Sequence, residues 1–243
     1  MPVFSERQRF VALAALAQVV LDVVASVLFF AVYDFDMGVL AANPAAFPAR
    51  GADVAGLLRW GGVIDMLAYL ALAPVVLYLH GRLTAVAAER GRGSWPINLL
   101  TVGGLGFVFV GAIGAALWAS AGPVLLEAGA QTPGTGSGTA AAAHVAFSLL
   151  ATGVNIGLWG TLEWLLLGVW LIGIGWIVRT EGRAFAWVAI AAGVGGLGYD
   201  ARTALSGHPP VDLTSPLDIM ILGGFGLFIL WVVWLAVRLW RGR

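Results

Sequence analysis

Three carboxylates lie inside long apolar stretches of this sequence, and they are the side chains best suited to chemistry: Asp22, Asp65 and Glu163. A charged group near the middle of a membrane costs roughly 2.5 to 3.5 kcal/mol on insertion scales, so each needs a partner or a wet cavity. Acidic residues in such positions often mark ion, proton or substrate paths. The three residues therefore indicate a site for a cation, a proton or a polar small molecule.

Other polar residues stand at helical spacing from these carboxylates. Residues four apart share a helix face, so Tyr69 is expected beside Asp65, and Asn155 and Trp159 on the face of Glu163. Four further charged residues near predicted helix ends could neutralise or gate the carboxylates: Arg59, Asp200, Arg202 and Asp218. The candidate binding residues are Asp22, Asp65, Tyr69, Asn155, Trp159, Glu163, Asp200 and Arg202.

The elements that must position these residues are predicted to be transmembrane helices. Hydrophobic residues make up 60% of the 243 positions and charged residues 11%. The apolar blocks are long enough to cross a hydrocarbon core of ~30 Å at ~1.5 Å per residue. We predict an all-α polytopic membrane protein, a single domain over 1–243 formed by a six-transmembrane-helix bundle. The predicted spans are 9–33, 57–79, 97–121, 152–178, 184–205 and 217–237.

The segments between the spans are predicted as an outer loop over 34–56, an outer Gly-rich linker over 122–139 and an outer helical extension over 140–151. The stretch 140–178 contains no Arg or Lys and would be about 58 Å long as one helix. We favour one crossing at 152–178 preceded by the extension. A tight turn near 155–160 would instead give seven helices and move the C terminus outside.

Arginine positions predict the orientation, because short cytoplasmic loops accumulate positive charge. With the N terminus inside, ten of the thirteen basic residues flank the inner side and only three lie outside: Arg50, Arg59 and Arg202. Both termini are therefore expected to be cytoplasmic, in a multi-pass protein of the plasma (inner) membrane. In this topology Asp22, Asp65 and Glu163 fall in one outer-leaflet layer, roughly 6 to 13 Å below the outer face.

Other interpretations of the polar residues stay open. They could form structural pairs, such as Arg59 with Asp65, or Arg202 with Asp200 or Glu163. The protein could be a non-catalytic accessory subunit whose glycine-rich faces pack against a membrane-protein partner or a second copy. It could also be an enzyme that acts on a lipid or quinone, with Asp65, Glu163 and His144 as acid, base or metal ligands.

Composition and spacing argue against several classes. The sequence has no Cys, which removes thiolate ligands and cysteine nucleophiles, and its zero formal net charge does not point to nucleic acid. The glycine runs lie in predicted spans, where they favour close helix packing over nucleotide binding. No metal-ligand spacing and no conventional catalytic constellation are visible, so we favour a non-enzyme, and the sequence identifies no cofactor. The lipid bilayer is the expected partner.

Three segments carry a resemblance to a known family: Gly61-Gly62-Val-Ile-Asp65-Met-Leu-Ala, the predicted long helix from His144 through Gly168 to Gly175, and Gly195-Gly196-Leu-Gly198-Tyr199-Asp200. With them the chain resembles a bacterial membrane-protein family known as domain of unknown function 4386. The resemblance covers most of the chain loosely. It implies a six-helix fold and no particular activity.

Overall fold

The computed structural model describes residues 6–36, 45–91, 93–130, 137–179, 182–206 and 215–242, and in these ranges every regular element is helical. The principal helices are α1 (Glu6–Val32), α3 (Ala55–Glu89), α4 (Trp95–Gly129), α5 (Ser137–Thr152), α6 (Trp164–Val178), α7 (Arg183–Ser206) and α8 (Pro216–Trp240). Two shorter segments are η1 (Gly51–Val54) and η2 (Gly153–Glu163). Six helical stretches are long and apolar enough to cross a membrane. The predicted all-α architecture with six such helices is confirmed.

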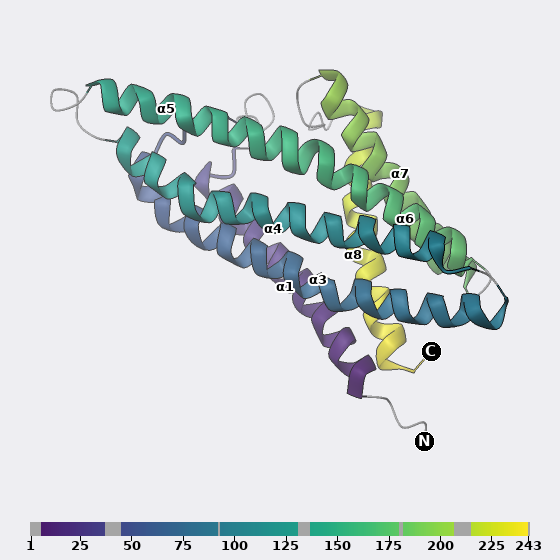
Figure 1. The fold of residues 1–243 in the computed structure, drawn as a ribbon. Helices are drawn as coiled ribbons and strands as arrows, with labels where there is room; N and C mark the ends of the chain where they lie inside the picture. Colours follow the sequence, from purple (N-terminus) through teal and green to yellow (C-terminus); the bar gives the residue numbers. More distant parts are fainter. Residues whose placement is uncertain are drawn as a thin grey trace.

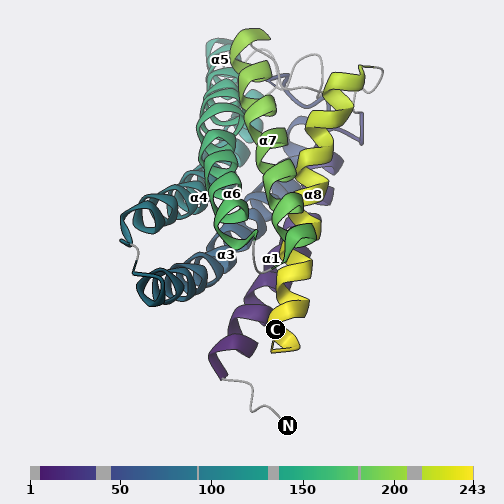
Figure 2. The same cartoon turned by 90° about the vertical axis from the view of Figure 1, so that its right-hand side faces the viewer.

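The six stretches form a closed ring of neighbours. Helix α1 packs on α3, α3 on α4, α4 on α6, α6 on α7, α7 on α8, and α8 on α1 (Figures 1 and 2). The start of α1 and the end of α8 lie at the same end of the bundle in both views. This arrangement gives the ring an interior to which several helices contribute side chains.

Glycines allow the helices of this ring to approach closely. A Cβ atom on Gly62 of α3 would lie 2.6 Å from the backbone of both Ala115 and Ala119 in α4. A Cβ on Gly224 of α8 would lie 2.8 Å from the Cα of Gly195 in α7. Small residues at such crossings let van der Waals contact hold helices together in lipid. Glycines at these crossings thus serve helix packing, as predicted for the glycine runs, whereas no atom lies within 4 Å of a Cβ built on Gly153, Gly157, Gly223 or Gly226.

The segments α5, η2 and α6 form one continuous helix, which crosses the molecule in Figure 1. Its apolar part runs over 41 residues, Gly138–Val178. The middle segment η2 is a π-helix, in which the hydroxyl of Thr161 donates to the carbonyl of Ile156, five residues earlier, at 2.8 Å. The irregularity falls where the alternative topology placed a turn, but the chain does not reverse there. The seven-helix alternative is therefore wrong.

Two predicted loops are shorter in the structure than the sequence suggested. Helix α4 continues through Pro123 to Gly129, so 122–129 are helical rather than part of a linker, and 131–136 lie outside the described residues. Leu126 is fully buried there and Gly122 packs on Leu58 of α3, so packing offsets the backbone hydrogen bond that a proline removes. Similarly, η1 and the start of α3 occupy the end of the predicted loop 34–56.

Candidate functional site

A polar layer separates two apolar cores of the bundle. One core includes Ala15 of α1, Leu72 of α3 and Leu171 of α6. The other includes Val32 of α1 and Leu58 of α3. The predicted carboxylates lie between these cores along each helix, so the layer is enclosed by apolar packing on both sides.

A small cavity of about 20 Å³ lies in this layer. This space suffices for about one water molecule or one small ion, which needs roughly 10 to 15 Å³. Side chains from α1, α3, α4, η2, α6 and α8 surround it, and none of them is Arg, Lys or His. The lining residues are Gln18, Asp22, Asp65, Ala68, Tyr69, Phe107, Glu163, Trp164, Leu167, Phe225 and Phe228.

Glu163, the last residue of η2, is held by one hydrogen bond. Its Oε1 accepts a hydrogen bond from the hydroxyl of Tyr69 at 2.8 Å. Its Oε2 is buried without a hydrogen-bond partner among the described residues, and so is Oε1 of Gln18 across the cavity wall. Both residues are at most 6% exposed. Two buried oxygens thus stay available to an occupant of the cavity.

Asp22 and Asp65 complete the carboxylates of the layer. Asp65 is buried at 7% exposure, whereas Asp22 is partly exposed. The structure records no hydrogen bond or ion pair from a described residue to either carboxylate. Their charges act on each other and on Glu163. The wall of the cavity thus carries three acidic side chains and no basic side chain that could compensate their charge.

Tyr69 is fixed in place by its contacts with α4. Its ring occupies the space that a side chain at Gly111 would need, and it packs edge-on against Phe107 at 5.5 Å between centroids. The hydroxyl is thereby directed at Glu163. Gly111 is therefore needed to place the Tyr69 hydroxyl beside Glu163.

Removing that hydroxyl tests the contact. Tyr69→Phe should lower the free energy of unfolding by about 1 to 2 kcal/mol, because Glu163 loses its hydrogen bond in a buried position. Tyr78→Phe on the same helix is the matched control, since the Tyr78 hydroxyl accepts from the described residues a single, long hydrogen bond of 3.4 Å from Gln8. Unfolding in detergent micelles measures both. Equal losses for the two variants would contradict the assigned role of the Tyr69–Glu163 bond.

Asn155 and Trp159 face the same side of the long helix as Glu163 but do not line the cavity. Asn155 Oδ1 accepts a hydrogen bond from the indole of Trp118 at 3.1 Å. The Trp159 indole donates to the carbonyl of Gly111 at 3.3 Å. Both contacts join η2 to α4 beside the layer. The binding role of these two residues stays a prediction.

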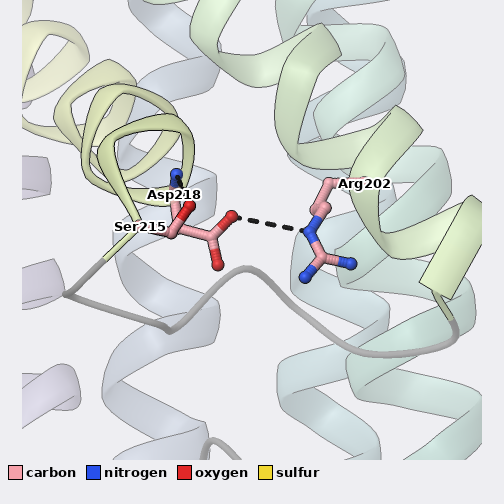
Figure 3. A network of polar contacts seen from close by, with 3 residues as sticks. All are labelled: Arg202, Ser215 and Asp218. Atoms are coloured by element: carbon pink, nitrogen blue, oxygen red, sulfur yellow. Dashed lines mark hydrogen bonds and ion pairs between the residues drawn. The ribbon is translucent and has the colours of Figure 1, made fainter.

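Asp200 and Arg202 of α7 also lie outside the cavity wall. The Nε of Arg202 pairs with Oδ1 of buried Asp218 at 3.5 Å, and Ser215 caps the same turn of α8 by accepting from the Asp218 N–H at 3.4 Å (Figure 3). Asp200 Oδ1 is buried without a hydrogen-bond partner in the described parts of the chain. The ion pair of Arg202 joins α7 to α8. The gating role of Asp200 and Arg202 stays a prediction.

The other predicted pairs and ligands have different neighbours. Arg59 lies 3.9 Å from Glu127 of α4, not beside Asp65. His144 stacks on Phe47 with ring centroids 4.0 Å apart and does not line the cavity. Within the described ranges, no group of three His, Asp or Glu side chains is placed to hold a metal ion.

Half of the cavity wall carried no signal in the sequence. The aromatic residues Phe107, Trp164, Phe225 and Phe228 look like any membrane-facing side chain, yet they enclose the carboxylates. Gln18 did carry a signal, because it stands four residues before Asp22. A polar residue one helical turn from an acidic residue therefore indicated the cavity lining better than the aromatic residues did.

Comparisons of the chain with protein-family models, with curated proteins and with solved structures find no match. The resemblance to domain of unknown function 4386 accordingly stays a prediction. The site must be interpreted from its own geometry.

Proposed function

We propose that this integral membrane protein binds a small monovalent cation at the layer of Asp22, Asp65 and Glu163 and moves it across the membrane from an outward-facing opening. A proton is favoured over a sodium ion, because within the described ranges these carboxylates are not placed to hold one metal ion together. The observation that carries the proposal is a cavity wall with three carboxylates and no basic side chain. Six helical stretches are long and apolar enough to span a bilayer, which supports transport across a membrane.

Electrostatics supports an occupant of positive charge. Carboxylates within a membrane domain are costly unless something neutralises them. No ion pair from a described residue reaches Asp65 or Glu163, so a bound proton or cation is the available source of compensation. Carboxylate, amide and phenol oxygens are also the ligands that hard cations prefer.

The size of the cavity supports a small occupant. A space of about 20 Å³ accommodates a proton on a carboxylate or one bare ion, and it is too small for an amino acid or a quinone ring. This favours ion handling over the proposal of an enzyme acting on a lipid or quinone.

The orientation of the bundle belongs to the same proposal. The termini of α1 and α8 share one end with Arg7, Arg9 and Arg238, which supports cytoplasmic termini in the plasma (inner) membrane under the positive-inside rule. Arg92 and Arg243, counted on the same side, lie outside the described residues.

Ion flux into proteoliposomes tests the proposal. Vesicles with the wild-type protein, an imposed membrane potential and an internal proton- or sodium-sensitive dye should show flux above that of protein-free vesicles. Asp65→Asn and Glu163→Gln keep shape but remove the charge, and each should reduce the flux to the protein-free level. Glu127→Gln, an exposed carboxylate at the end of α4, is the matched control and should leave it unchanged.

The two dyes separate a proton from a sodium ion as the cargo. Wild-type vesicles without flux of either ion, or flux that survives in both Asp65→Asn and Glu163→Gln, would contradict the proposal. Correct folding of each variant is checked by monodisperse elution in detergent.

A second candidate is an accessory subunit that binds a membrane-protein partner or a second copy. Gly223 and Gly226 of α8 support it, because no atom lies within 4 Å of a Cβ built on either residue. Gly104, Gly111 and Gly122 of α4, by contrast, are filled by side chains of this chain. Ion handling is favoured over the accessory-subunit proposal. Most of the glycines already pack against other helices of this chain and are not available to a partner.

A further inference from the structure

A second hollow, separate from the carboxylate layer, lies where α6 ends and α7 begins. It measures about 570 Å³ and is lined by two arginines, two tryptophans and two aliphatic residues: Trp176, Arg179, Arg183, Ala186, Trp187 and Ile190. The guanidinium of Arg238, in the last turn of α8, lies 5.0 Å from the ring centroid of neighbouring Phe185. The hollow thus belongs to the end of the bundle at which α8 finishes.

The two arginines of this hollow offer donors to an anion. The Arg179 guanidinium stacks over the Trp176 ring at 3.8 Å and donates one hydrogen bond to the Trp176 carbonyl at 3.4 Å. An arginine carries five N–H donors, so most of those on Arg179 stay available. Arg183 is exposed, and the structure records no ion pair between it and a described residue. Glu181, in the connection between the helices, lies outside the described residues.

The backbone adds to this positive charge. Helix α7 runs over 24 residues from Arg183 to Ser206, and its N terminus opens at the hollow. Unpaired N–H groups and the helix dipole favour negative charge at such an end. A phosphate group matches both the forked arginine donors and the helix terminus.

The remaining walls of the hollow are apolar and aromatic. Trp176 and Trp187 are 61% and 63% exposed, although each is a large side chain on an apolar helix. Tryptophan is enriched at the membrane interface, where its ring contacts both headgroups and chains. Ile190 lies one turn beyond Ala186 along α7, so an acyl chain can follow the helix into the bilayer.

From this combination we propose that the α6–α7 hollow binds the phosphate headgroup of an anionic phospholipid such as phosphatidylglycerol. Arg179, Arg183 and the start of α7 hold the phosphate, and Trp176 and Trp187 flank the glycerol and upper acyl chain. A free phosphate ion would use the arginines but leave the aromatic walls without contacts. The proposal does not depend on cation transport by the carboxylate layer.

Native mass spectrometry of the full-length protein tests this site. The wild type, titrated with phosphatidylglycerol or phosphatidylcholine in mixed micelles, should retain phosphatidylglycerol preferentially. One arginine near a membrane surface contributes about fivefold to such affinity, so Arg183→Gln should weaken binding about fivefold and Arg179→Gln with Arg183→Gln about thirtyfold. Arg90→Gln, an exposed arginine outside the hollow, should change nothing.

Two further arms identify the ligand and check the fold. Inorganic phosphate should not displace bound phosphatidylglycerol, and Arg179→Lys with Arg183→Lys should recover much of the affinity in a protein of unchanged elution volume. Equal retention of the two lipids by the wild type would overturn the proposal. So would full phosphatidylglycerol affinity in the double glutamine variant, or displacement of the lipid by phosphate.

Discussion

Replacing Phe107 by alanine is expected to lower the free energy of unfolding by about 3 kcal/mol, the lower end of the range for buried Phe→Ala changes. Phe107 is 4% exposed and packs edge-on against Tyr69 at 5.5 Å and Phe228 at 5.9 Å. In lipid the separated helices do not expose the ring to water, so lost packing rather than transfer accounts for the effect.

Phe109→Ala provides the matched control for that change. It removes the same atoms from the same helix, two residues away, but Phe109 is 57% exposed. Unfolding of both variants in the same detergent should show little loss for Phe109→Ala. If the two variants lost equal stability, the bundle interior would not be packed as described.

The second large effect is expected at Gly62, where α3 crosses α4. A Cβ at this position would lie 2.6 Å from backbone atoms of Ala115 and Ala119, and backbone cannot move aside as a side chain can. Gly62→Ala must therefore separate the two helices. We expect a loss of about 1 to 3 kcal/mol, as for other overpacked sites, although alanine has the higher helix propensity.

Gly56→Ala tests whether the effect comes from the crossing. Gly56 lies in the same helix, and no atom is within 4 Å of a Cβ built on it. Relief of backbone entropy should leave this variant equal to the wild type or more stable by up to about 1 kcal/mol. A destabilised Gly56→Ala, or an undisturbed Gly62→Ala, would contradict the close α3–α4 contact.

Much of the fold followed from hydropathy, because a membrane requires long apolar helices that satisfy their own backbone. Helix rise placed Asp22, Asp65 and Glu163 at similar depth, and they line one cavity although they come from distant parts of the chain. Their depth below the outer face of a membrane stays a prediction. The position of a side chain along its helix follows from its residue count from the helix end. This count needs no knowledge of the tertiary contacts.

Partners of individual side chains could not be obtained in this way. Arg202 pairs with Asp218 across α7 and α8, and Asn155 bonds to Trp118, because the rotation of each helix about its axis decides which side chains meet. That rotation depends on glycine contacts and on the π-helical turns of η2. The end of α4 was missed for a related reason, since the helix continues beyond the predicted span 97–121 to Gly129, and Gly122 packs there on Leu58.

The continuous helix from Gly138 to Val178 has a consequence for how the protein sits in a bilayer. At ~1.5 Å per residue its 41 residues measure about 60 Å, against roughly 40 to 45 Å for a bilayer with its headgroups. It lies wholly within that thickness only at a tilt of roughly 41° to 48° from the membrane normal, steeper than the roughly 0° to 40° found for membrane helices. Its outward-facing Val145 and Leu149 are apolar, which suits contact with lipid. In a thinner membrane this helix must tilt further from the membrane normal, and it is the helix that carries Glu163.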